Sequence, residues 1–355
     1  MAIKLTPGKL YFIRDVDYLT GKVGSYVKIG IVTKSRTTEK RMKEHQTGNP
    51  RGIFEVHEVV DVPFVERLET HVHYEHNERW ITGEWFLLDN KETKAVYQRA
   101  EALKTEQIAS QKTVRNALEK LSVTVSNGKI KKATKAGKDL EAKLLKLKAE
   151  QNVLNAQIEI SKYGFYQLMG ANGSIDGVVR IKHAPPALNF DEEAFKKAHP
   201  KIHKKYVLKK SNKIAKRFNL SNVSDASLAK IDPTLNATKK SLGKTTYTEA
   251  QLDHVKKRTK KLEKMHLDHL VLFRKEKLCS FEYEMLQYEL QALVGAHEGI
   301  DGICSWSRKK QNVPAAFDTA EFKNAEPALY DKFCTKARKE SFAMEVEKGR
   351  AYKPR

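Results

Sequence analysis

The chain has 355 residues and a mass of 40.5 kDa, a length that favours two or three domains over one. Its 66 Lys and Arg against 44 Asp and Glu give a formal net charge of +22, which favours a polyanionic partner, most often nucleic acid. No stretch approaches the roughly 20 apolar residues of a membrane span. The first residues lack the apolar run of a signal peptide, and three scattered cysteines exclude a disulfide framework. We therefore expect a cytoplasmic protein without a membrane partner.

The positive charge is unevenly distributed along the chain. Residues 1–95 hold 15 Lys and Arg against 14 Asp and Glu, whereas the remainder holds 51 against 30, a net charge of +21. If DNA is the partner, most of the salt-dependent affinity should come from this basic body through counterion release. A helical surface with an excess of solvated lysines is the alternative explanation of the same charge.

The first 95 residues alternate between strand and helix signals. Strand patterns fall at 10–13, 26–32, 53–60 and 83–88, and helix patterns fall at 37–46 and 63–76. The first helix is expected to begin with Thr37 or Thr38 as its N-cap and to end just before Gly48. The first two strands are expected to form a hairpin.

Short motifs follow one another in this segment in a recognisable order. They are Lys9-Leu10-Tyr11, Lys28-Ile29-Gly30, Arg41 followed by His45, Gln46-Thr47-Gly48-Asn49-Pro50, Glu69 followed by His73, and Gly83-Glu84-Trp85-Phe86. In order and spacing they resemble a GIY-YIG nuclease domain, in the bacteriophage-rich branch whose second motif reads KIG. The resemblance covers the first quarter of the chain. It implies phage or mobile-element origin and a metal-dependent endonuclease that hydrolyses DNA phosphodiester bonds.

Phosphodiester cleavage gives each of these residue types a chemical use. The Arg41 guanidinium matches phosphate oxygens, and one carboxylate, Glu69, is enough to anchor a hard Mg²⁺ (or Mn²⁺) ion that keeps several waters. His45 lies one helical turn from Arg41 and is a candidate to relay a proton. The resemblance implies that Tyr11 helps to activate the attacking water. Lys28, in place of the second motif's tyrosine, is a candidate to bind phosphate or to depress the pKa of Tyr11.

Other hypotheses use the same segment. Glu69, His73 and His76 fall on one helical face and would suit zinc, although the His-Glu-x-x-His pattern of zinc proteases is absent. Lys9 stands where the GIY-YIG family usually has glycine, which leaves open a catalytically inactive DNA-binding regulator built on a nuclease fold. A structural helical adaptor that binds protein is a third hypothesis.

The remaining residues carry mainly helical patterns. Long patterns cover 96–122, 138–168 and 248–293, and their spacing indicates a coiled coil and a homodimer formed through these regions. The interval 207–247 is rich in Lys, Ser, Asn and Thr, and we expect it to be a basic connector.

An internal repeat occupies much of this body. Residues 163–178 align with 288–303 at a constant offset of 125, and after a two-residue insertion Phe190 aligns with Phe317. Each copy is expected to form a helix ending at glycine, a turn, a strand pair and a short helix capped by an aspartate, Asp191 or Asp318. The copies resemble an appendage of some phage YqaJ-type recombination nucleases.

Basic residues accompany the predicted strand pairs of both copies. They are Arg180 and Lys182 in the first copy and Arg308, Lys309 and Lys310 in the second. We expect these residues to bind DNA. Trp306 is expected either to stack on a base or sugar or to pack in the core.

The sequence thus predicts an α+β protein. A small antiparallel sheet flanked by helices should occupy residues 1–95, and a mainly helical body with two repeated helix–hairpin–helix modules should follow it. The first helical region and module cover 96–206, the connector covers 207–247, and the second helical region and module cover 248–355.

Overall fold

The computed structural model describes residues 6–33, 37–47, 51–208 and 211–349. The chain is mixed α and β, with an antiparallel sheet at the N-terminus followed by a largely helical body. Of the predicted turn after the first helix, Gly48 to Pro50 lie outside the described residues. No helix in the described part of the chain is both long and apolar enough to span a membrane.

The N-terminal sheet has five strands in the order β3-β1-β2-β5-β4. Its elements are β1 (Gly8–Val16), β2 (Val23–Thr33), α1 (Thr38–Gln46), β3 (Gly52–Val62), α2 (Val65–Glu75), the 3-10 helix η1 (Asn77–Arg79), β4 (Trp80–Thr82) and β5 (Trp85–Leu87). Alternation along β1 buries Leu10 and Phe12 against α2 and the next helix, α3 (Asn90–Leu121), and it places Tyr11 and Ile13 on the opposite face, toward α1. The predicted strands and helices of this segment are confirmed, with one further short strand, β4.

The body consists of long helices, short helices and narrow sheets. Its first half contains β6 (Ile130–Lys131), α4 (Lys135–Met169), β7 (Ser174–Ile175), β8 (Val179–Ala184), β9 (Ala187–Asn189), α5 (Glu192–Ala198), α6 (Pro200–Lys205), β10 (Ser211–Leu220), η2 (Val223–Ala226), α7 (Leu228–Ile231) and α8 (Pro233–Lys240). Its second half contains η3 (Glu249–Gln251), β11 (Val255–Lys256), α9 (Lys260–Val294), β12 (Gly299–Ile300), β13 (Cys304–Val313), α10 (Thr319–Ala325), α11 (Pro327–Lys332), β14 (Lys336–Arg338) and β15 (Ser341–Val346).

Segments that correspond in sequence form corresponding elements. Helices α4 and α9 each have 35 residues, begin after a threonine N-cap and end at a glycine with positive φ, Gly170 or Gly295. Asp191 and Asp318 cap α5 and α10 as predicted, each accepting a backbone N–H from three residues ahead. We call β6 to β10 the first copy and β11 to β15 the second copy.

The long strands of each copy pair with the other copy. Strand β8 pairs with β15, β13 pairs with β10, and β9 pairs with β14, in each case across the two copies. Among the described residues of each copy, the pairings within the copy are short hairpins, β7 with β8 and β12 with β13. The prediction that each copy forms a self-contained helix–hairpin–helix module is therefore wrong. Each copy is completed by strands that the other copy supplies, because period-two alternation fixes a strand's face and not its partner.

The predicted connector at 207–247 contains regular structure. It holds β10, which forms a ten-residue antiparallel ladder with β13, and the short helices α7 and α8, which pack on α4. Its polar composition hid this strand, since a two-stranded arm with exposed surfaces tolerates lysine and asparagine.

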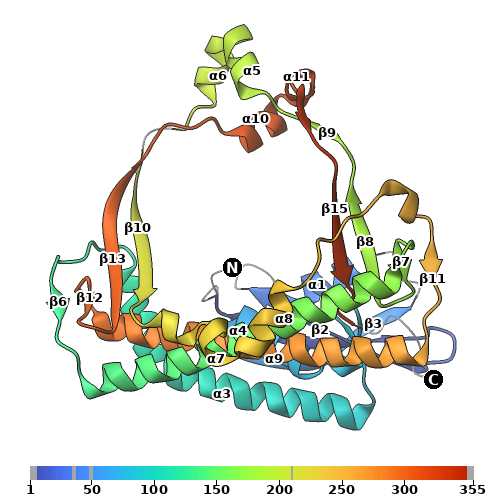
Figure 1. Cartoon of the computed structure of the whole chain (residues 1–355). Coiled ribbons are helices and arrows are strands. Elements are labelled where there is room, and N and C mark those ends of the chain that lie inside the picture. The colour runs from blue at the N-terminus through green and yellow to red at the C-terminus, as the bar shows by residue number, and fades with distance from the viewer. Residues whose placement is uncertain (1–5, 34–36, 48–50, 209–210, 350–355) are drawn as a thin grey trace.

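Figure 1 shows how these pairings shape the body. Helices α3, α4 and α9 form a base, from which two arms rise: the first arm is β10 with β13, and the second arm is β8 with β15. The far ends of both arms meet in a cluster of aromatic rings drawn from both copies, including Phe190 and Phe195 from the first and Phe317 and Phe322 from the second. The N-terminal sheet packs on the base through α2 and α3, which both contact α9.

Candidate active site

The register of β1 and β2 builds the floor of the site. Tyr11 is paired with Gly30, and Ile13 is paired with Lys28, so the side chains of Tyr11 and Lys28 lie on one face of the sheet. A Cβ atom added to Gly30 would overlap the Tyr11 hydroxyl and lie 2.7 Å from its Cζ and 3.0 Å from Oε2 of Glu84. Glycine is therefore required at position 30 because the phenol and the carboxylate occupy the space above it.

Helix α1 brings two further side chains over this floor. Thr37 caps its first turn by accepting the N–H of Lys40, as predicted. At its other end the Gln46 amide donates to the carbonyl of Arg51 at 2.9 Å and accepts the N–H of Ile53 at 3.0 Å, which ties the helix to β3. These contacts fix the helix that carries Arg41 and His45.

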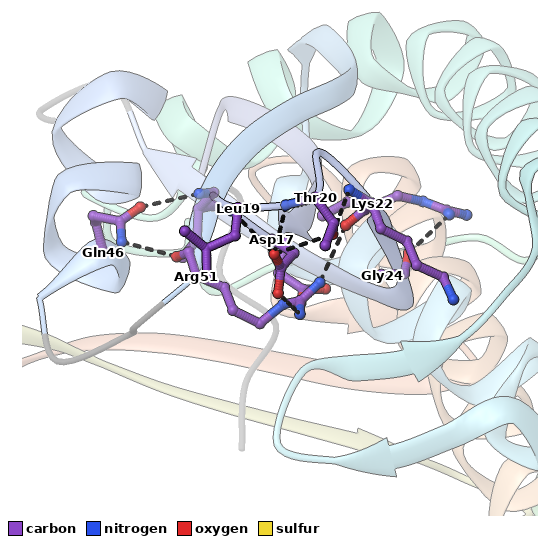
Figure 2. A network of polar contacts seen from close by, with 10 residues as sticks. Asp17, Leu19, Thr20, Lys22, Gly24, Gln46 and Arg51 are labelled. Carbon is purple, nitrogen blue, oxygen red and sulfur yellow. Dashed lines mark hydrogen bonds and ion pairs between the residues drawn. The ribbon is translucent and has the colours of Figure 1, made fainter.

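A second set of contacts holds the residues beside α1, as Figure 2 shows. The Arg51 guanidinium pairs with Asp15 and, at 3.2 Å, with Asp17, and it donates to the carbonyl of Lys22 at 3.2 Å. The loop between β1 and β2 is thereby joined to the start of β3. The backbone carbonyl of Arg51 also accepts the hydrogen bond from the Gln46 amide of α1. Arg51 therefore connects the loop and α1 in one network.

The Tyr11 hydroxyl lies between two side chains of α1. Its oxygen is 3.1 Å from Nε2 of His45, and it is hydrogen-bonded to the Arg41 guanidinium. Burial and the nearby Glu84 carboxylate raise the pKa of Tyr11 to about 12, and the hydrogen bond with Arg41 offsets only part of this. Burial and the charges of Lys28 and Arg41 lower the pKa of His45. At neutral pH the phenol is therefore protonated and the imidazole neutral, so that the phenol O–H can donate to Nε2.

Of the two roles considered for Lys28, depression of the pKa of Tyr11 is contradicted, because that pKa is raised, and phosphate binding stays a prediction. Nζ of Lys28 is 2.6 Å from Oε2 of Glu84 and 5.9 Å from the centroid of the Trp85 ring. The lysine charge is thus compensated by the same carboxylate that raises the pKa of Tyr11. Lys28 fixes Glu84 in place instead of activating the phenol.

Two carboxylates influence each other at the edge of this group. Burial, and after it the charge of Glu84, raises the pKa of Glu69 to about 8, while Lys28 and Arg41 act in the opposite direction. The region around Glu69 therefore favours added positive charge, whether a proton or a bound cation. Tyr11, Arg41 and His45 are in contact or adjacent, whereas Lys28 and Glu69 are linked to them through the effects of their charges on pKa values.

Glu84 is the site residue that sequence reasoning missed. It follows Gly83, whose φ of 55° forms the tight turn between β4 and β5, and its carbonyl accepts the N–H of Ile29 at 3.0 Å. The glutamate belongs to the Gly83-to-Phe86 motif, whose pattern predicts a strand over 83–88 and gives no role to this side chain. Its charged side chain next to buried aromatic residues was the signal that could have marked it.

The donor set suits an oxygen-preferring cation. Glu69 and Glu84 supply carboxylates, and Mg²⁺ or Mn²⁺ binds through one or two carboxylates with waters and substrate phosphates as further ligands. Within the described ranges no group of three or more His, Cys, Asp or Glu side chains is arranged to hold a metal ion. His73 of the zinc hypothesis is buried, and its Nε2 lies 2.8 Å from the carbonyl of Ile29. Nε2 of His73 is therefore already engaged by the backbone, which argues against the zinc hypothesis.

The predicted DNA-binding residues of the second copy divide into two groups. Trp306 is 3% exposed and packs in the core above α9, which favours the core alternative over base stacking. Arg308 is fully buried, with its guanidinium 4.1 Å from the centroid of the Trp306 ring and donating to the carbonyls of Leu121 and Gly295. Trp306 and Arg308 are therefore buried among protein groups and do not present a surface to DNA. Lys309 and Lys310 are exposed.

In the first copy the predicted DNA-binding cations are engaged in ion pairs. Arg180 pairs with Glu345 at 3.1 Å and with Glu347 at 3.3 Å, and Lys182 pairs with Glu345 at 2.7 Å. Both cations are exposed at their ends, but carboxylates of β15 and of the residue after it compensate their charge.

Comparison with known proteins places the site within a described family domain. Residues 8–101 match the family model of the T5orf172 domain, a phage-associated domain of the nuclease type. This range contains all the residues of the candidate active site. No curated protein and no solved structure matches the chain. The first quarter of the chain is therefore nuclease-like, with DNA as the implied partner.

Proposed function

We propose that the protein is a metal-dependent DNA endonuclease of the GIY-YIG type, with a basic helical body that binds and targets DNA of phage or mobile-element type. The observation that carries the proposal is a phenol, an imidazole and a guanidinium gathered over one face of a sheet in a nuclease-type domain, close enough to the Glu84 and Glu69 carboxylates for their charges to act on one another. The sequence motifs and this arrangement support the same chemistry independently.

The chain's own groups have separable roles in the proposed reaction. Arg41, half-buried on α1 beside Tyr11 and paired with Glu44 of the same helix, binds a non-bridging phosphate oxygen and stabilises the charge that develops on it. His45 is neutral at pH 7 and accepts a proton from the attacking water, directly or through the Tyr11 hydroxyl 3.1 Å away. Tyr11, protonated because of its high pKa, orients that water and the imidazole.

The carboxylates provide the place for a cation. Glu69 would be the main ligand of that cation, and Glu84, already paired with Lys28, would be a second candidate. A bound Mg²⁺ or Mn²⁺ ion would polarise the phosphate and help the leaving oxygen. Until a cation is present, the elevated pKa of Glu69 keeps a proton in its place.

The experiment that tests this function is a plasmid nicking assay. We expect purified protein to convert supercoiled plasmid to nicked or linear forms with Mg²⁺ or Mn²⁺ and not with EDTA. Glu69→Ala should abolish cleavage while DNA binding without metal stays unchanged. Glu39→Ala is the matched control, because Glu39 is an exposed α1 carboxylate whose partner is Lys43 on the same helix.

Two results would contradict the proposal. Cleavage by Glu69→Ala at the wild-type rate would overturn the assignment of the site. DNA binding by the wild type without cleavage of any plasmid, with either metal, would instead favour the inactive regulator on a nuclease fold.

A further inference from the structure

The two arms are built alike, so their charges can be compared position by position. Each arm pairs a strand of one copy with a strand of the other, and each turns one face toward apolar residues of the base. The register of the ladders makes the outer cross-strand pair Arg180 and Glu345 in the second arm correspond to Ser305 and Asn219 in the first. A difference in charge between the arms can therefore be assigned to different residues at equivalent positions of the two ladders.

The second arm is close to electrically neutral. Strands β8 and β15 contain two cations, Arg180 and Lys182, and one anion, Glu345. Glu345 contacts both cations, at 3.1 and 2.7 Å, and Glu347 adds a second carboxylate beside Arg180. A polyanion approaching this arm would have to compete with carboxylates that are already in place.

The first arm carries only positive charge. Strands β10 and β13 contain six cations and no Asp or Glu. Arg308 is the buried one, and the exposed cations are Lys213, Lys216, Arg217, Lys309 and Lys310. None of these five has an ion pair or a side-chain hydrogen bond with any other described residue.

The register brings these cations close to one another. Lys309 faces Ala215, which places it diagonally next to both Lys213 and Arg217 on one side of the arm. Such diagonal neighbours are separated by about 7–8 Å at the backbone, within reach of long side chains. At the matching positions of the second arm, Lys309 is replaced by Ala184 and Arg217 by Ala343. Unpaired like charges at this spacing repel each other and are stabilised by an anionic partner.

The other side of the first arm adds a concave surface. Lys216 and Lys310 are diagonal neighbours there, and they line a pocket of about 470 Å³ beside the end of α3 at Ser122, to which Lys213 of the first side also contributes. The pocket has no acidic residue in its lining. Cations thus lie on both sides of the arm, as suits a partner whose charge extends over a long surface.

We propose that the first arm holds the phosphate backbone of duplex DNA and that the second arm does not. The inference rests on the proposed function for the identity of the polyanion. A duplex carries a dense row of negative charge along its axis, and each phosphate that a cation neutralises releases counterions. The duplicated body therefore binds DNA asymmetrically through one arm, despite its internal repeat.

The test compares two doubly substituted proteins that lose the same residue types from the same side of each arm. Arg217→Gln with Lys309→Gln changes the first arm, and Arg180→Gln with Lys182→Gln changes the second, so the net charge falls by two in both. Affinity for a short fluorescein-labelled duplex of mixed sequence is measured by anisotropy in EDTA over a range of NaCl concentrations. We expect the first double variant to reduce the slope of log affinity against log salt by about 1.8, from about 0.9 for each lost contact.

The second double variant should keep the wild-type slope. Equal losses in both variants, or a larger loss in the second, would overturn the proposal. A charge-preserving variant, Arg217→Lys with Lys309→Arg, should bind like the wild type, and loss of binding there would mean that the arm acts through its shape. Cleavage is measured separately in Mg²⁺: a protein that cuts plasmid but has equal arms refutes only this inference, whereas one that binds through the first arm without cutting refutes only the proposed function.

Discussion

At the scale of single residues, the geometry of the site depends on Gly30, which has no side chain. The Tyr11 ring and the Glu84 carboxylate both lie over Gly30, and only a glycine leaves them room. The distance of 3.1 Å between the Tyr11 hydroxyl and His45 follows from this close approach. The glycine of the second motif is thus explained by packing under the phenol. It affects catalysis indirectly, because it lets Tyr11 keep its position beside His45.

Gly30→Ala should therefore damage catalysis more than folding. The new Cβ would lie 2.7 Å from Cζ of Tyr11, so the ring must move away from His45. We expect cleavage to fall by about 100-fold, as for other small misplacements of reacting groups, with a stability loss of about 1–3 kcal/mol from overpacking. Plasmid cleavage rates and thermal melting measure the two effects.

The matched control is Gly164→Ala in α4. Its Cβ would meet only Cε of Met265, at an ordinary 3.7 Å. This change should leave cleavage unaltered and stabilise the helix by about 0.5–1 kcal/mol. Unchanged cleavage by Gly30→Ala would show that the contact between Tyr11 and His45 is not needed.

At the scale of elements, helix α2 joins the site to the body. The carboxylate of its last residue, Glu75, accepts three hydrogen bonds from Arg99 of α3, at 2.8, 3.1 and 3.3 Å, and lies 3.1 Å from Nε2 of His71. The backbone carbonyl of Glu75 also accepts a hydrogen bond from the guanidinium of Arg274 in α9, at 3.3 Å. Burial alone would raise the pKa of Glu75, but the bonds from His71 and Arg99 outweigh it and lower the pKa to about 2.

This shift predicts a pH dependence of stability with a definite sign. A carboxyl group whose pKa is depressed on folding stabilises the protein above its unfolded pKa, and this stabilisation is lost as the pH falls through the folded value. Glu75→Gln should lower the free energy of unfolding by about 1 kcal/mol at pH 6, a figure reduced for solvent screening of a partly exposed pair. The difference from wild type should shrink between pH 4.5 and 2 and vanish below it.

Urea unfolding of both proteins across this pH range provides the measurement. Glu101→Gln on α3 is a suitable control, since its contact with Lys104 at 3.6 Å lies within one helix. A gap between wild type and Glu75→Gln that stays constant down to pH 2 would contradict the assigned linkage.

Contacts within one element are predictable from the sequence, whereas contacts between distant elements are not. The caps at Thr37, Asp191 and Asp318 were predictable because each bonds a backbone N–H only three residues away. Arg308 was not, because its partners include the carbonyl of Leu121, far away in the chain, and a buried arginine looks in sequence like an exposed one. Glu84 was missed for the same reason, since its contacts with Lys28 and Tyr11 arise from the order of strands in the sheet.

At the scale of the whole molecule, the repeat forms an interlocked pair within one chain. Hydrogen bonds occur in matched couples across the copies: Asp191 N–H donates to Phe333 and Asp318 N–H to Tyr206, both at 2.8 Å. The repeat was visible in the sequence, but the exchange of strands was not. Duplication shows which segments are alike, whereas the partner of each strand depends on how the connecting segments cross the base.

The interlocked pairing predicts that the two copies hold together without a continuous chain. The segment after α8 is exposed around Gly243 and Lys244 and has no regular structure, so a protease site inserted between Lys244 and Thr245 should be cut without disturbing either copy. Because β10 pairs with β13 and β15 pairs with β8, we expect the two fragments to co-elute in size-exclusion chromatography and to separate only in denaturant.

The fragment 245–355 expressed alone should be insoluble or unfolded, since β13 and β15 would lack their long partners and the apolar surface of α9 would be exposed. Fragments that separate under native conditions, each with native circular dichroism, would show instead that the copies are independent modules and that the exchanged strands contribute little to the fold.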